Sequence, residues 1–130
     1  LGDVYKRQEI DITAQTGIKS LDVTIDCDNL DAKELGTMGI PARFDLCNIE
    51  GFEDTNGTMH PAEDVREAIS ALGFPIEDAV KDKPSIRLKI DKMFTRLLTG
   101  FPGNNNFILT VTENNGLSTT KTLKYYVPAN

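Results

Sequence analysis

The chain has 130 residues, a hydrophobic fraction of 39% and a formal net charge of −6. This length fits one domain with one hydrophobic core. The excess of acidic side chains argues against a nucleic-acid partner, because phosphate recognition needs clustered Lys and Arg. No apolar run approaches the roughly 18 residues that a membrane-spanning helix requires, so we expect no membrane span in this segment.

Residues 1–8 do not match the rest of the chain in character, and they resemble a translated sequencing-adaptor remnant of the kind found at the ends of metagenomic contigs. We interpret them as a non-native leader, with a genuine linker or strand start as the alternative. The chain opens at Leu1 and not at Met, which is typical of a fragment or an excised domain. We therefore expect a single domain over residues 9–127, with residues 128–130 as a tail or the start of a linker.

The first half of the chain predicts three strands and one short helix. Polar and apolar residues alternate over residues 9–14 and again over 20–26, as on half-buried strands. These two strands are either neighbours across a tight turn or members of facing sheets. A short helix is predicted over 32–38, a third strand over 42–47, and a polar loop over 48–60.

The second half predicts the longest helix and three more strands. Val65, Ala68, Ile69 and Leu72 recur at helical spacing over residues 61–72. The other predicted elements are a strand at 85–90, a short helix that Asp91 caps and that carries Phe94, Leu97 and Leu98, and a hairpin of strands 106–112 and 117–127 around the Asn114-Asn115-Gly116 turn.

The order of these elements constrains the fold class. The strands do not alternate regularly with crossover helices, which argues against a doubly wound parallel sheet. The pattern predicts a mainly β fold, namely an immunoglobulin-like β-sandwich with short helices inserted in the connections. The alternative is an open α+β sheet with the 61–72 helix covering one face.

Several segments carry a family resemblance. Residues 106–123 read N-F-I-L-T-V-T-E-N-N-G-L-S-T-T-K-T-L, which resembles the last hairpin of bacterial immunoglobulin-like repeats. The further segments are G-I-K-S-L-D-V-T-I-D at 17–26, E-L-G at 34–36, G-I-P-A-R-F-D-L at 39–46, A-L-G-F-P at 71–75 and S-I-R-L-K-I-D at 85–91. Together they resemble a module of unknown biochemical role in outer-surface lipoproteins of Bacteroidetes.

This resemblance covers most of residues 9–127 and implies a location and partners. It implies an extracellular immunoglobulin-like module of a multi-domain surface protein, held at the outer membrane by a lipid anchor that lies N-terminal to this segment. The implied partners are neighbouring domains of the same chain. The family offers no catalytic motif to carry over.

The residues themselves also give no enzyme signature. The one histidine, His60, directly precedes Pro61, and nothing in the spacing pairs it with a nucleophile such as Cys27 or Cys47. Phosphate-binding glycine motifs and zinc-ligand spacings do not occur. We therefore predict a protein that is not an enzyme and needs no cofactor.

Calcium is the one metal that the sequence suggests. Asp26, Asp28, Asn29 and Asp31 offer oxygen ligands within six residues at the end of a predicted strand. An EF-hand loop starting at Asp26 fails, because its sixth and twelfth positions hold Asp31 and Thr37. The remaining alternatives are a looser inter-strand calcium site and a set of turn and helix-capping residues.

Two aromatic residues are candidates for ligand binding. The adjacent Tyr125 and Tyr126 face opposite sides of a strand, which makes Tyr126 the outward one, and Phe52 lies in the polar loop. The sequence thus predicts a non-catalytic spacer or interaction module, with a glycan- or protein-recognition domain that uses Phe52 or Tyr126 as the alternative. Cys27 and Cys47 are either a disulfide or two free thiols, and their opposite strand parity argues against the bond.

Overall fold

The computed structural model describes residues 9–89 and 92–129, and the side chains of residues 92–94 lie outside that description. The fold is mainly β, as predicted. The elements are β1 (Glu9–Thr13), β2 (Ile18–Cys27), α2 (Ala32–Thr37), β3 (Arg43–Asp45), β4 (Phe52–Glu53), β5 (Met59–His60), α3 (Ala62–Ala71), the 3₁₀ helix η1 (Glu77–Ala79), β6 (Ser85–Lys89), α4 (Lys92–Leu98), β7 (Gly103–Glu113) and β8 (Ser118–Val127).

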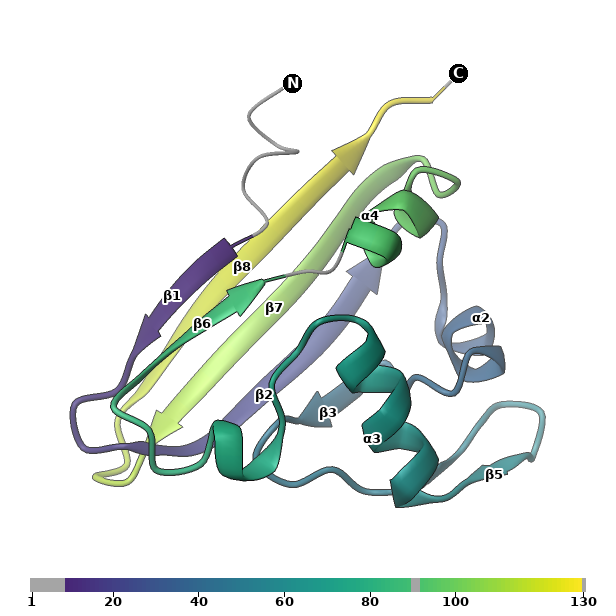
Figure 1. Ribbon diagram of the computed structural model, residues 1–130. Helices are drawn as coiled ribbons and strands as arrows, with labels where there is room; N and C mark the ends of the chain where they lie inside the picture. Colours follow the sequence, from purple (N-terminus) through teal and green to yellow (C-terminus); the bar gives the residue numbers. More distant parts are fainter. Residues whose placement is uncertain (1–8, 90–91, 130) are drawn as a thin grey trace.

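The strands of the described residues form three antiparallel sheets. The large sheet has the strand order β3-β2-β7-β8, while β1 pairs with β6 and β4 pairs with β5. In Figure 1 the β1–β6 ribbon and helices α3 and α4 lie across one face of the large sheet. The strands β1 and β2 are therefore members of different sheets, which decides between the two arrangements that the sequence left open.

The core lies between the large sheet and this covering layer. Alternation along the strands places one side chain of every two in the core. The buried apolar set of the large sheet is Ile18, Leu21, Val23, Ile25, Phe44, Phe107, Leu109, Val111, Leu123, Tyr125 and Val127. Val65 and Ile69 of α3 join this core from the covering layer. Phe74 packs against β3 and β7, because its ring centroid lies 5.9 Å from that of Phe44 and 6.5 Å from that of Phe107.

The opposite face of the large sheet is polar. Thr110 and Thr120 pair across β7 and β8 with hydroxyl oxygens 3.1 Å apart, and Thr112 and Ser118 do so at 2.9 Å. Hydroxyl pairs of this kind stabilise neighbouring strands without an apolar cover. Among the described residues, no helix is long and apolar enough to cross a bilayer.

One segment differs from the sequence-based expectation. Residues 48–60, predicted as a loop, contain the short hairpin of β4 and β5. In α4, Leu98 is fully buried, whereas Leu97 is 41% exposed. A seven-residue helix buries only a narrow stripe, so two consecutive residues do not both face the core. The expectations for residues 1–8, for Ile90 and Asp91, and for the side chain of Phe94 fall outside the described residues.

Candidate functional site

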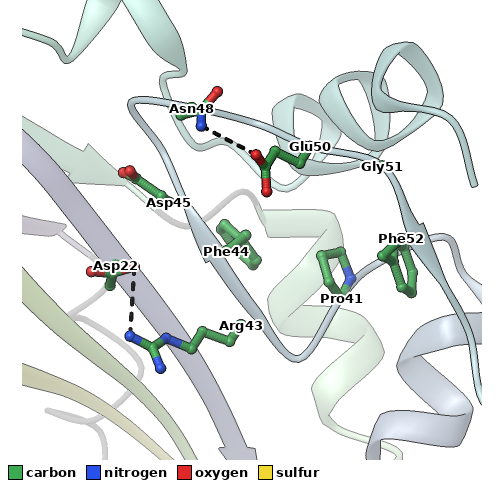
Figure 2. Close-up of a pocket in the computed structure, with 9 residues that line it drawn as sticks. All are labelled: Asp22, Pro41, Arg43, Phe44, Asp45, Asn48, Glu50, Gly51 and Phe52. Carbon is green, nitrogen blue, oxygen red and sulfur yellow. Dashed lines mark hydrogen bonds and ion pairs between the residues drawn. The ribbon is translucent and has the colours of Figure 1, made fainter.

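A depression of about 450 Å³ lies beside β3, at one edge of the large sheet. We call it the β3-edge pocket. Figure 2 shows that the chain from Pro41 to Phe52 runs around it in a U and that Asp22 of β2 stands at its side. The lining residues are Asp22, Pro41, Arg43, Phe44, Asp45, Asn48, Glu50, Gly51 and Phe52. The volume is in the range of ordinary small-molecule sites.

The turn that closes the U is fixed by Asp45. Its Oδ1 accepts hydrogen bonds from the backbone N–H groups of Leu21, at 3.0 Å, and Cys47, at 2.9 Å. Its carbonyl oxygen accepts a third from the N–H of Asn48 at 3.1 Å. Asp45 therefore ties the turn to β2, and the polar rim of the pocket is held by the sheet and not by a free loop.

Three apolar side chains form the other wall. Pro41 and Phe52 lie at the two ends of the U, and in Figure 2 the side chain of Pro41 stands between those of Phe44 and Phe52. Phe44 is buried, whereas Pro41 and Phe52 are half-buried. The ring of Phe52 stacks on the imidazole of His60, with ring centroids 4.8 Å apart and an interplanar angle of 15°. The position of the Phe52 ring thus depends on the β4–β5 hairpin.

That hairpin is held by a buried carboxylate. Oδ2 of Asp54 lies 2.8 Å from Nε2 of His60, and the two side chains are 5% and 18% exposed. Oδ1 of Asp54 accepts the N–H groups of Asn56 and Thr58 at 2.8 and 3.0 Å. The hydrogen bond from His60 is the largest of several interactions that hold the pKa of Asp54 below its ordinary value. The hairpin is therefore built around an ionised Asp54 side chain.

The polar rim is dominated by negative charge. It contains the carboxylates of Asp22, Asp45 and Glu50 and one cation, Arg43. Arg43 reaches Asp22 only at 3.9 Å, and its own side chain is 72% exposed. Asn48 donates to Oε1 of Glu50 at 3.5 Å, a long hydrogen bond. The carboxylates of Asp22 and Glu50 therefore make only long, weak contacts with these partners.

The two aromatic residues predicted to bind a ligand are not brought together. Phe52 lines the β3-edge pocket, whereas Tyr126 lies on β8, at the other edge of the four-stranded sheet, with a side chain that is 42% exposed. Sequence reasoning did not find Asp22 or Glu50. Their only sequence signal was an acidic residue on the polar face of a strand and another in a polar loop, which many surface positions share.

The four residues proposed to bind calcium have separate places. Asp31 caps α2 by accepting the N–H of Glu34 at 2.9 Å, and Asp28 accepts the N–H of Asn104 at 2.8 Å. Asn29 donates to the carbonyl of Pro102, and Asp26 is exposed on β2. Capping and turn interactions thus occupy Asp28, Asn29 and Asp31. Within residues 9–89 and 92–129 no group of three or more His, Cys, Asp or Glu side chains is arranged to hold a metal ion.

Both cysteines are free thiols and half-buried. Leu46 donates its N–H to Leu21 at 2.9 Å, so Cys47 lies near the start of β2, whereas Cys27 lies at its end. Six residues of strand separate these points by roughly 20 Å, far beyond the reach of a disulfide. Burial raises the pKa of each thiol to about 11.

No family model matches the chain, and no match was found among curated proteins or solved structures.

Proposed function

We propose that this chain is an immunoglobulin-like interaction module of a bacterial surface protein, without catalytic activity, and that it recognises its ligand in the β3-edge pocket. The module is exported and is lipid-anchored through a part of the protein N-terminal to it. This location and the neighbouring domains as partners rest on the family resemblance of the sequence segments. The recognition role rests on the geometry of the pocket.

The strand order supports the immunoglobulin-like assignment. In that fold, strands B and E pair in one sheet, and strands C′, C, F and G follow one another in the other. Here β1 pairs with β6, and the large sheet runs β3-β2-β7-β8, all antiparallel. If β1, β2 and β3 are strands B, C and C′, then β6, β7 and β8 are strands E, F and G, and the chain order agrees at every position.

The departures from that pattern are also informative. Within the described part of the chain, strands A and D have no counterpart. The stretch between β3 and β6, where strand D would run, is occupied by the β4–β5 hairpin, α3 and η1. The segment that replaces an edge strand is thus the one that forms the far wall of the β3-edge pocket.

The side chains support a binding role and not catalysis. Nε2 of His60 is hydrogen-bonded to Asp54. The other ring nitrogen, Nδ1, faces Gly39, where an added Cβ would lie 3.7 Å from it. A nucleophile activated by His60 would need to lie within hydrogen-bonding reach of the ring. The thiols offer little reactivity at neutral pH, because burial raises their pKa values. By contrast, the pocket combines an apolar wall with polar groups that are only weakly hydrogen-bonded, a combination typical of ligand-binding sites.

The test is a binding screen of the full chain on glycan and peptide arrays, each run with calcium and with a chelator. We expect a reproducible ligand whose binding is lost in Phe52→Leu and in the double variant Asp22→Asn with Glu50→Gln. Tyr126→Ala is the matched control, because it removes an exposed aromatic ring at the far edge of the sheet. Loss of binding in Tyr126→Ala alone would move the site to β8.

A screen that is silent with the folded chain, under both conditions, would refute the recognition role and leave a spacer. A ligand that binds only with calcium and is unaffected by the pocket variants would instead support a cation site at Asp26 to Asp31. Glycan recognition is the second candidate function. It is favoured by the Phe52 ring, which offers a flat apolar face beside the hydrogen-bonding groups of Asn48 and Glu50.

A further inference from the structure

Within the described residues, the β3-edge pocket adjoins a strand edge on which no further strand pairs. β3 is the outermost strand of the large sheet and spans only Arg43–Asp45. The N–H of Ile25 bonds to the carbonyl of Ala42 at 2.8 Å, and the N–H of Leu46 bonds to the carbonyl of Leu21 at 2.9 Å. Because antiparallel strands use alternate residues for each neighbour, Arg43 and Asp45 turn their backbone groups away from β2, toward the pocket.

The chain that returns along the pocket does not fill this edge. Asp45 and Asn48 form a single bridge at the turn, and residues 50–52 then diverge from β3. Figure 2 shows the opening between the two arms of the U, with the side chain of Glu50 directed across it. The space between the arms lies where an additional strand would pair with β3.

The negative charge of this opening favours an added strand that carries basic side chains. Three carboxylates and one guanidinium give the lining a formal charge of −2, from Asp22, Asp45 and Glu50 against Arg43. The whole chain carries a net charge of −6, which attracts cationic partners over a longer range. The apolar wall beside these carboxylates accommodates the methylene stem of a long basic side chain, and the face of Phe52 attracts its charged end.

We infer that the β3-edge pocket binds an extended basic peptide segment, which adds as a strand to β3 and places a Lys or Arg side chain against Glu50 and Asp22. The outward backbone groups of Arg43 supply the hydrogen bonds, because Asp45 already bridges to Asn48. The pocket supplies the side-chain preference, as in other cases of strand addition to a sheet edge. This inference rests on the proposed recognition function, and it names the partner by its chemistry.

The first experiment measures binding of fluorescein-labelled, terminally blocked six-residue peptides to the full chain by fluorescence anisotropy at low salt. The peptides alternate threonine and valine around a central lysine, glutamate or norleucine. We expect the lysine peptide to bind at least about fivefold more tightly than the other two, and this preference to shrink with added salt.

Two variants with opposite signs test the charge mechanism. Glu50→Gln removes a carboxylate and is expected to weaken the lysine peptide about fivefold, whereas Arg43→Gln removes the competing cation and is expected to tighten it. Both side chains lie on the rim, and the fold of each variant is checked by its unfolding transition. Equal affinity for the three peptides, or shifts of the same sign in the two variants, would overturn the inference.

The backbone contribution is tested by N-methylation of the lysine peptide at alternate residues, in two registers. A strand bonds to β3 through every second residue, so one register should lose binding and the other should keep it. Tolerance of both registers would overturn strand addition. A glycan that binds to the pocket while every peptide fails would also overturn this inference, but it would leave the proposed function standing. If neither a glycan nor a peptide binds, both the inference and the proposed function are refuted.

Discussion

The imidazole of His60 stacks on Phe52 while its Nε2 lies 2.8 Å from Oδ2 of Asp54. One histidine thereby connects the wall of the β3-edge pocket to the carboxylate that holds the β4–β5 hairpin. Asp54 and His60 are the least exposed pair of acidic and basic side chains among the described residues. The pocket and the hairpin should therefore respond together to changes at Asp54.

The first prediction concerns the pH dependence of stability. The pKa of Asp54 is lower in the folded chain than in the unfolded chain, so Asp54 stabilises the fold above its unfolded pKa. This contribution is lost as the pH falls through its lower, folded pKa. Asp54→Asn should therefore be less stable than the parent at neutral pH, and the difference should shrink in acid. Urea unfolding at several pH values between neutral and about 3 measures both effects.

The control for this experiment is Asp11→Asn. Asp11 also has a lowered pKa, through its hydrogen bond to Arg87, but it lies on the exposed β1–β6 ribbon. Only the Asp54 variant should also change ligand binding at the pocket, because Asp54 positions the hairpin that carries Phe52. A stability difference that stays constant with pH would show that Asp54 acts as a hydrogen-bonding group without regard to its charge.

The second prediction concerns Gly36, in helix α2. A Cβ at this position would lie 2.8 Å from Cβ of Asp54 and 3.8 Å from its Cα. Alanine normally favours a helix by about 1 kcal/mol over glycine, but crowding in a packed region costs about 1–3 kcal/mol. We expect Gly36→Ala to lower the free energy of unfolding and to displace the hairpin.

Gly100→Ala is the matched control, because its added Cβ would have only an ordinary contact of 3.5 Å with the carbonyl oxygen of Leu97. Its stability should stay within about 0.5 kcal/mol of the parent. If Gly36→Ala were as stable as Gly100→Ala, the contact between α2 and the hairpin would be looser than the structure indicates.

The sequence predicted the regular part of the fold well. Alternating residues such as Leu21, Val23 and Ile25 repeat often enough to identify β2 and the face that it buries. The β4–β5 hairpin was missed because strands of two residues carry no periodicity. Its order comes instead from the bonds that Asp54 makes to Asn56, Thr58 and His60.

The candidate site was predicted only in part. Phe52 was identified as an aromatic residue in a polar loop, but Asp22 and Glu50 became neighbours through the pairing of β2 with β3 and the turn at Asp45. Strand register depends on long-range pairing, which a single sequence specifies only weakly. For Asp28 and Asp31 the sequence allowed cation ligands or caps, and their oxygens accept backbone N–H groups, as capping residues do.

The third prediction concerns the thiols of Cys27 and Cys47. With pKa values of about 11, each thiol is ionised to only about one part in a thousand at pH 8. Alkylation in the folded state should be on the order of a hundredfold slower than for a free cysteine and should accelerate as the pH rises. Mass spectrometry after timed iodoacetamide treatment, with and without urea, measures this protection. Rapid labelling of either folded thiol would contradict it.

The fourth prediction concerns the outer edge of β8, on which no other strand of the described part of the chain pairs. Lys121 pairs with Leu109 on the core-facing side of the sheet, and its Nζ donates to the backbone carbonyl of Asp11 at 3.0 Å. The side chain thus places a charge across the gap between β8 and β1, at the edge of a ten-residue strand. Inward-pointing charges of this kind discourage edge-to-edge association of sheets.

Lys121→Val should therefore promote association of the chain through β8, seen as concentration-dependent oligomers in sedimentation velocity. Lys124→Val is the matched control, because it makes the same chemical change on the same strand but on the opposite, polar face. Association of both variants to the same extent would indicate general surface stickiness, and two monomeric variants would show that Lys121 does not protect the edge. Association of Lys121→Val alone would identify the contact between Lys121 and Asp11 as the feature that keeps this edge unpaired.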